Sequence, residues 1–106
     1  MKVLFGVDVG GTDIKLGAFD WKSQKLLKKW AIKTDLSNEG KQIIPDVAKE
    51  IQSYLCENAL SEADVYGIGM GIPGPVDKDG NVEVCVNLFW NNFNPAEEMR
   101  KFFPHA

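Results

Sequence analysis

The sequence predicts an α/β fold with a mixed sheet that opens with three antiparallel strands. Apolar runs at residues 3–9 and 14–20 flank a diglycine turn, and a third run at about 25–33 follows a polar turn. A stretch with apolar residues at helical spacing comes next, followed by a second apolar run of strand length at 65–72. These observations predict a meander of three strands, a helix and a further strand.

The stretch after the meander predicts one amphipathic helix that ends near Asn58. Its apolar side chains recur three and four positions apart and therefore share one helix face: Ile43, Ile44, Val47, Ala48, Ile51 and Leu55. Pro45 fits only in the first turn or at a kink, because it has no N–H group to donate. Three antiparallel strands, a helix and a further strand have the order of a ribonuclease-H-like half-domain.

The strand at 65–72 is expected to stop at Pro73-Gly74-Pro75, because these residues interrupt regular structure. Asp79-Gly80 lies between Val76-Asp77 and residues 82–86. An Asp-Gly pair between two strand-like runs is a hairpin signal. The sequence therefore predicts a small hairpin at this point.

The polar residues 91–94 predict a loop that leads into a second helix. Pro95 opens this helix, which is expected to run to about Phe103, and Asn94 is expected to cap it. Trp90 has two interpretations: it contacts a ligand, or it anchors the core. We favour the core.

Composition indicates one ordinary globular domain with a modest core in 106 residues. Apolar residues make up 44% and charged residues 25%, which does not indicate disorder. No apolar run approaches the roughly 18 residues that a membrane helix needs. Asp8 interrupts the apolar start of the chain, so no secretory signal is predicted. We expect a cytoplasmic protein without membrane contact.

Charge and cysteine content argue against nucleic acid and against zinc. The net charge is −3, whereas nucleic-acid binding favours a basic stripe. The lysines between residues 22 and 33 are interpreted as the charged edge of a hairpin. Cys56 and Cys85 lack CxxC spacing and are expected to be reduced. With only His105 beside them, they cannot form a zinc site.

The run Val7-Asp8-Val9-Gly10-Gly11-Thr12-Asp13-Ile14-Lys15 has the residue types of a phosphate site. Two adjacent glycines permit a positive φ and a close ligand, so N–H groups near Gly11 and Thr12 can point at phosphate oxygens. The hydroxyl of Thr12 can donate too, and Lys15 can supply positive charge. Asp8 can hold hydrated Mg²⁺, which prefers a carboxylate and retained waters.

A plain hairpin is the alternative explanation of the diglycine, since Gly-Gly between two strands is a common turn. The flanking Asp, Thr and Lys favour the phosphate site. The run is not a Walker loop, because Gly-x-x-x-x-Gly-Lys-Ser/Thr is absent and residues 16–19 predict a strand rather than a helix.

The run Asp8-Val9-Gly10-Gly11-Thr12-Asp13-Ile14-Lys15 resembles the first phosphate motif of the ROK family of sugar kinases and repressors, within the wider actin, Hsp70 and hexokinase fold. In that family the motif is usually Asp-x-Gly-Gly-Thr-Asn-x-Lys or -Arg, so Asp13 stands where Asn is usual. The resemblance implies a ribonuclease-H-like fold that binds ATP and Mg²⁺. The residues that it places on ATP are Asp8, which would meet the metal through water, Gly10, Gly11, Thr12 and Lys15.

A second glycine cluster at residues 67–77 has competing interpretations. Gly69-x-Gly71-x-x-Gly74 matches the dinucleotide fingerprint, but that fingerprint needs a helix, which Pro73 and Pro75 disfavour. A strand of small residues packed against the helix explains the first glycines. Gly74 is interpreted as functional, because a missing side chain at the carboxyl end of a strand leaves space for a ligand.

Two segments resemble the elements that form the sugar pocket in the ROK family. Gly71-Ile72-Pro73-Gly74-Pro75-Val76-Asp77 resembles the family's Gly-x-Pro-Gly-Pro-Val-Asp stretch, which lines the sugar pocket. Asn87-Leu88-Phe89-Trp90 resembles its Pro-Asn-Leu-x-Trp element, with Val86 where proline is common. The resemblance implies that Gly74 and Asn87 contact the sugar.

Phosphoryl transfer also needs a group that orients or deprotonates the attacking hydroxyl. The resemblance places this base, an aspartate in Asn-Asp-x-Asn, and a Cys/His zinc motif beyond Ala106. No catalytic residue is therefore assigned in this sequence. Asp77 is the other carboxylate near the sugar loop, but it precedes a turn and is interpreted as turn chemistry. We expect residues 1–106 to be the N-terminal part of a glucokinase-like ROK kinase domain, truncated before the catalytic aspartate and the second lobe.

The leading hypothesis is the N-terminal portion of an ATP-dependent sugar kinase, with a hexose or an N-acetylhexosamine as substrate. Residues 1–106 alone are expected to be inactive. The alternative is a ROK-type sugar-responsive repressor without its DNA-binding module; Met1 directly precedes the first strand, which favours the kinase. A more distant chaperone ATPase or acetate or polyol kinase is disfavoured by the sugar elements. The full-length parent is expected to be a homo-oligomer, with zinc only outside residues 1–106.

Overall fold

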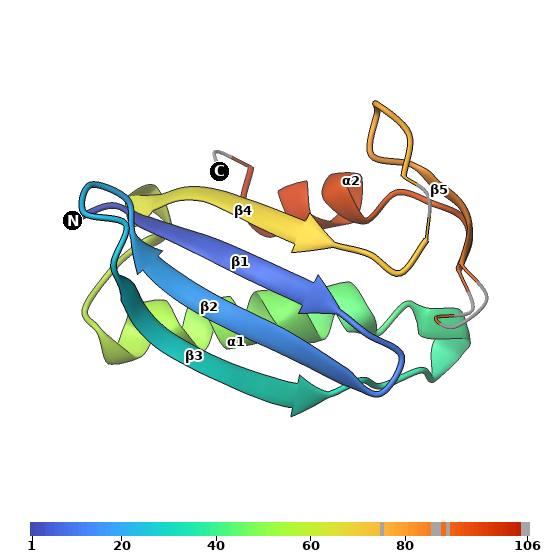
Figure 1. Ribbon diagram of the computed structural model, residues 1–106, viewed down its shortest axis with the longest axis horizontal. Helices are drawn as coiled ribbons and strands as arrows, with labels where there is room; N and C mark the ends of the chain where they lie inside the picture. Colours follow the sequence, from blue (N-terminus) through green and yellow to red (C-terminus); the bar gives the residue numbers. More distant parts are fainter. Residues whose placement is uncertain (75, 86–87, 89, 105–106) are drawn as a thin grey trace.

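A four-stranded mixed sheet with a long helix behind it forms the body of the computed structural model, which describes residues 1–74, 76–85, 88 and 90–104 (Figure 1). β1 pairs antiparallel with β2, β2 pairs antiparallel with β3, and β4 runs parallel to β1. The predicted mixed sheet with an antiparallel meander is confirmed. The strands stand in the order β3 (Leu26–Lys33), β2 (Asp13–Asp20), β1 (Val3–Val9), β4 (Val65–Gly71).

Helix α1 (Ile43–Glu57) packs its apolar face against one side of the sheet and contributes seven buried residues to the core. All six apolar residues of the predicted stripe are buried, and Tyr54 is buried with them. Pro45 lies in the first turn, as expected. The sheet contributes alternate residues to the same core: Val3, Phe5, Val7 and Val9 from β1, and Ile14, Leu16 and Ala18 from β2.

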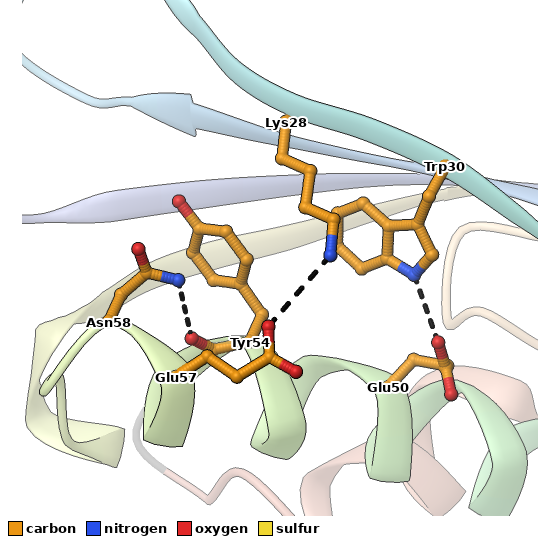
Figure 2. A network of polar contacts seen from close by, with 6 residues as sticks. All are labelled: Lys28, Trp30, Glu50, Tyr54, Glu57 and Asn58. Atoms are coloured by element: carbon orange, nitrogen blue, oxygen red, sulfur yellow. Dashed lines mark hydrogen bonds and ion pairs between the residues drawn. The ribbon is translucent and has the colours of Figure 1, made fainter.

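Polar and aromatic contacts fasten α1 to β3 (Figure 2). The Trp30 indole stacks on Tyr54, with ring centroids 5.8 Å apart, and its Nε1–H donates to Glu50 Oε1 at 3.0 Å. Lys28 lies 4.9 Å from the centroid of the Trp30 ring and 4.0 Å from Glu57 Oε2. Desolvation by burial raises the pKa of Tyr54. The β3 edge of the sheet therefore carries charged side chains and is also bonded to helix α1.

A second, smaller sheet pairs β5 (Val82–Cys85) with β6 (Trp90–Phe93). The prediction that residues 82–86 form a hairpin with residues 76–77 was wrong, because the partner strand of β5 is β6. Asp77 and Asn81 instead close a tight turn, in which Asp77 N donates to Asn81 O at 3.1 Å. The predicted loop at 91–94 was also wrong, since residues 91–93 belong to β6. Pairing with β5 outweighs the low strand propensity of asparagine.

Helix α2 (Pro95–Arg100) follows β6 directly. The predicted cap is confirmed, because Asn94 Oδ1 accepts the N–H of Glu97 at 3.0 Å. The helix ends at Arg100 rather than near Phe103, although Phe103 is buried in the core. Among the described residues, no helix has the length and apolar character needed to cross a membrane.

Trp90 anchors the second sheet to the body of the domain. Its side chain is 2% exposed, and its Nε1–H donates to the backbone oxygen of Gly40 at 2.8 Å. Gly40 has a φ of 75°, and a Cβ there would collide with the carbonyl oxygen of Leu88 and lie 2.8 Å from Trp90 Nε1. Glycine is therefore required at this position. The core role favoured for Trp90 is confirmed.

We expect Trp90→Phe to lower the free energy of unfolding by about 1–3 kcal/mol, because the buried carbonyl of Gly40 loses its donor. Urea unfolding followed by circular dichroism measures this loss. The matched control is Trp21→Phe, since Trp21 is 38% exposed and phenylalanine keeps a ring against Tyr66. The control should cost less than about 0.5 kcal/mol. Equal losses in the two variants would contradict the anchoring role.

Candidate functional site

The turn between β1 and β2 is braced by a threonine that follows β3. Gly10 N donates to Asp13 O at 3.0 Å and closes the turn. Thr34 Oγ1 donates to Gly10 O at 2.7 Å, and Thr34 N donates to Thr12 O at 2.9 Å. Two carbonyl groups of the turn are thus occupied on the side that faces Thr34.

The two N–H groups at the centre of the turn belong to Gly11 and Thr12. Within the described residues, no hydrogen bond is found from the N–H of Gly11 or of Thr12. Thr12 is exposed and Gly11 is half-buried, so this part of the turn lies at the surface. Successive unpaired backbone N–H groups form a site for an anion. We call residues 10–12 the phosphate turn.

The glycines of the phosphate turn have a different role from the one predicted. The described glycines with positive φ are Gly40 and Gly80, and neither Gly10 nor Gly11 is among them. The positive φ that two adjacent glycines permit is therefore not adopted in this turn. Gly10 is needed for space instead, because a Cβ there would lie 2.8 Å from the carbonyl oxygen of Asp13.

Asp8 and Lys15 lie side by side on the face of the sheet that α1 leaves open. They are register partners in the β1–β2 pair, and Asp8 is also the partner of Gly71 on β4. Both side chains are exposed, and among the described residues no ion pair joins them. A Cβ on Gly71 would lie 3.7 Å from Asp8 Oδ1, so the carboxylate extends over a strand with no side chain at that point. Both charged groups are available to a ligand.

A hollow of about 520 Å³ opens on the same face, next to Asp8 and Lys15. Its floor includes Gly6, Gly17 and Gly69, which are register partners on three neighbouring strands. At these three positions the strands carry no side chain, whereas the Phe19 ring lies within 3.6 Å of where a Cβ on Gly6 or Gly17 would be. A polar ligand bound at the phosphate turn could therefore extend into this hollow.

Asp13 contributes its main chain to the turn and its side chain to the open face. Its carbonyl oxygen accepts the N–H of Gly10, and its register partner on β3 is Lys33. The side chain is exposed, as are its neighbours Thr12 and Lys15. A second carboxylate thus lies on the face that carries the candidate phosphate residues.

The predicted sugar residues are only partly placed. Gly74 lies in the loop after β4, and its N–H donates to Ile72 O at 2.8 Å. β1 and β4 are parallel, so this loop and the phosphate turn lie at the same edge of the sheet. Asn87 lies outside the described residues. No hydrogen bond between the described part of this loop and the phosphate turn is found.

Asp77 is engaged in turn structure, as predicted. Its Oδ1 accepts the N–H groups of Asp79 and Asn81, each at 2.9 Å. Its carbonyl accepts the N–H of Gly80 at 3.0 Å. A carboxylate with these partners orders the turn rather than serving as a free base.

No group of three or more His, Cys, Asp or Glu side chains suited to a metal occurs in the part of the chain that the structure describes. Asp8, with Asp13 as the second carboxylate on this face, offers at most a small set of oxygen ligands. That donor set fits Mg²⁺, which commonly binds through one or two carboxylates and keeps several waters. It does not fit zinc, which takes four ligands in structural sites.

The sequence reasoning missed Thr34. In the sequence, Thr34 looks like an ordinary loop residue, and its position beside the phosphate turn becomes evident only when the strands are paired. The signal was available, since pairing 14–20 with 25–33 brings the residue after Lys33 next to Thr12.

Gly10→Ala should lower the free energy of unfolding by about 1–3 kcal/mol, because the new methyl group meets backbone rather than a movable side chain. Thermal unfolding measures the change. Gly69→Ala is the matched control, since a Cβ at Gly69 has nothing within 4 Å. Its stability should be unchanged or slightly raised. If both variants behave alike, the close approach at Gly10 is not what selects glycine.

The chain is similar to known proteins of one family. It matches the ROK family model over residues 4–104. A glucokinase of Halalkalibacterium halodurans is 37% identical over 97 residues, which cover 91% of this chain and 29% of the glucokinase. The chain thus spans less than a third of the length of this curated relative.

Solved structures agree with the fold. The ROK hexokinase from Thermus thermophilus has a TM-score of 0.74 at 25% identity, over 96% of this chain and 32% of that one. The inorganic polyphosphate/ATP-glucomannokinase from Arthrobacter sp. strain KM has a TM-score of 0.77 at 23% identity, over 98% of this chain and 42% of that one, and this likeness shows the fold alone. With the family match extending over nearly its whole length, this chain belongs to the ROK family.

Proposed function

We propose that this chain forms the phosphate-facing part of an ATP-dependent, glucokinase-like sugar kinase. The observation that carries the proposal is the phosphate turn, where the N–H groups of Gly11 and Thr12 have no acceptor within the part of the chain that the structure describes. Asp8 and Lys15 flank the turn on the open face. Membership of the ROK family and the similarity to a glucokinase support a sugar kinase rather than another phosphate-binding protein.

Each residue has a distinct task in this proposal. The N–H groups of Gly11 and Thr12 and the hydroxyl of Thr12 bind phosphate oxygens. Gly10 lets the turn close. Lys15 adds positive charge from the neighbouring strand position. Asp8 holds Mg²⁺ through retained water, and the metal would neutralise phosphate charge during transfer.

The sugar side is proposed to involve Gly74 and Asn87, with a hexose or an N-acetylhexosamine as substrate. The turn that Asp77 closes follows the Gly74 loop directly, and Asn94 Nδ2 donates to Asp79 O at 3.0 Å. Asn94 also caps α2, so the turn is tied to a helix. This bracing supports a fixed shape for the turn at residues 77–81, which follows the proposed sugar residue Gly74.

Asp77 is not proposed as the catalytic base, because its carboxylate accepts two N–H groups of its own turn. We infer that the base, the zinc motif and the second lobe belong to a longer parent, of which this chain is the N-terminal part. The relatives named above are kinases, so the repressor alternative is not proposed. A cytoplasmic location and a homo-oligomeric parent remain predictions.

Titration of the isotope-labelled chain with MgATP tests the phosphate turn. We expect amide signals of Gly11 and Thr12 to shift with millimolar affinity, since half a nucleotide site is present. Lys15→Met should weaken this affinity about three- to tenfold, because one charge-assisted contact is lost. Lys49→Met is the control, with the same charge change on the exposed face of α1. Absence of amide shifts in the unaltered chain, or equal weakening by both variants, would contradict the proposal.

Asp13→Asn should tighten MgATP binding about two- to fivefold, because a carboxylate beside the phosphates is replaced by a neutral amide. The gain should shrink as salt is raised, since both groups are exposed to solvent. The same NMR titration measures it. Glu62→Gln removes one negative charge far from the turn and should leave the affinity unchanged. A weaker affinity in Asp13→Asn would indicate that the carboxylate assists the metal.

A further inference from the structure

One side chain outside the phosphate turn controls the direction of a peptide group within it. Thr34 Oγ1 donates to Gly10 O at 2.7 Å, in a partly buried contact. The peptide unit that joins Gly10 to Gly11 is planar and trans, because cis bonds are absent from the described backbone. The C=O and N–H of a trans peptide point in opposite directions. When Thr34 holds the carbonyl of Gly10, the N–H of Gly11 must therefore point away from Thr34.

The backbone of Thr34 restrains the other end of the turn. Its N–H donates to Thr12 O at 2.9 Å. One residue thus holds the carbonyl of Gly10 and the carbonyl of Thr12, on either side of the peptide group that joins Gly11 to Thr12. Rotation of either held peptide group would break a hydrogen bond, so the direction of the Gly11 N–H is set before any ligand binds.

Thr34 is itself held in place by the segment that it begins. Gly40 N donates to Leu36 O at 3.3 Å and to Ser37 O at 3.2 Å, which closes the short turn at the far end of this segment. Gly40 O accepts the buried indole N–H of Trp90. The segment from Thr34 to Gly40 is therefore fixed at both ends, one on the phosphate turn and the other on the second sheet (Figure 1).

We propose that Thr34 is a positioning residue whose hydroxyl orients the Gly11 N–H toward a bound phosphate. This inference rests on the proposed function of the phosphate turn and adds a residue that contacts no ligand itself. Pre-organised donors bind more tightly because no reorganisation is needed when the ligand binds. The N–H of residue 34 can still donate to Thr12 O in Thr34→Val and Thr34→Ser, so a difference between these variants comes from the side chain.

The test compares Thr34→Val with Thr34→Ser in the 106-residue chain, with MgATP as the probe. Valine keeps the branched shape but has no hydroxyl, whereas serine keeps the hydroxyl. We expect Thr34→Val to weaken MgATP affinity about three- to tenfold, as measured by the Gly11 amide shift, because one orienting hydrogen bond is lost. Thr34→Ser should remain within about twofold of the unaltered chain, and Ser53→Ala, an exposed hydroxyl on α1, should have no effect.

A purely structural role makes a different prediction. It would lower the unfolding midpoint of Thr34→Val in urea while leaving the affinity of the folded fraction unchanged, and that result would overturn the proposal. If Thr34→Ser bound MgATP as weakly as Thr34→Val, the proposal would be overturned too. If valine cannot be accommodated, Thr34→Ala against Thr34→Ser asks the same question. If the unaltered chain shows no MgATP shift, the proposed function itself fails, and the positioning role fails with it.

Discussion

The site depends on the alternation of side chains along the central strand β1. Val3, Phe5, Val7 and Val9 point into the core beneath α1, and this burial fixes the register of the strand. Asp8 must then point to the open face. A slip of one residue would bury its carboxylate and expose the core face of β1. Hydrophobic packing on one face thus determines where charge stands on the other.

The same constraint brings the partners of Asp8 together. β2 and β4 flank β1, so Lys15 and Gly71 occupy the register positions beside Asp8. The two parallel strands end at one edge, where the phosphate turn and the Gly74 loop follow. The helix therefore contributes to a site that it does not touch.

The main sheet and α1 could be predicted because each follows a simple period that local sequence carries. The second sheet could not. Asn91 and Asn92 are poor strand formers. They belong to β6 through its pairing with β5, and Trp90 at the start of β6 is anchored on Gly40, fifty positions away. The residue types of the phosphate turn could be identified from the sequence, but their conformation could not. Gly10 permits a positive φ, yet the structure selects glycine there because a Cβ would approach the carbonyl oxygen of Asp13 too closely. Thr34 was missed because its role exists only after β2 and β3 pair.

Recognition by main-chain groups explains how this turn accommodates an unusual residue. Asp13 closes the turn through its carbonyl oxygen, which accepts the N–H of Gly10. An amide or a carboxylate side chain would leave this bond intact, because neither takes part in it. The geometry of the donors is therefore insensitive to Asn or Asp at this position, while the electrostatic potential that a phosphate meets is not. Fold and affinity are set by different atoms of one residue, so the substitution can change binding without disturbing the turn.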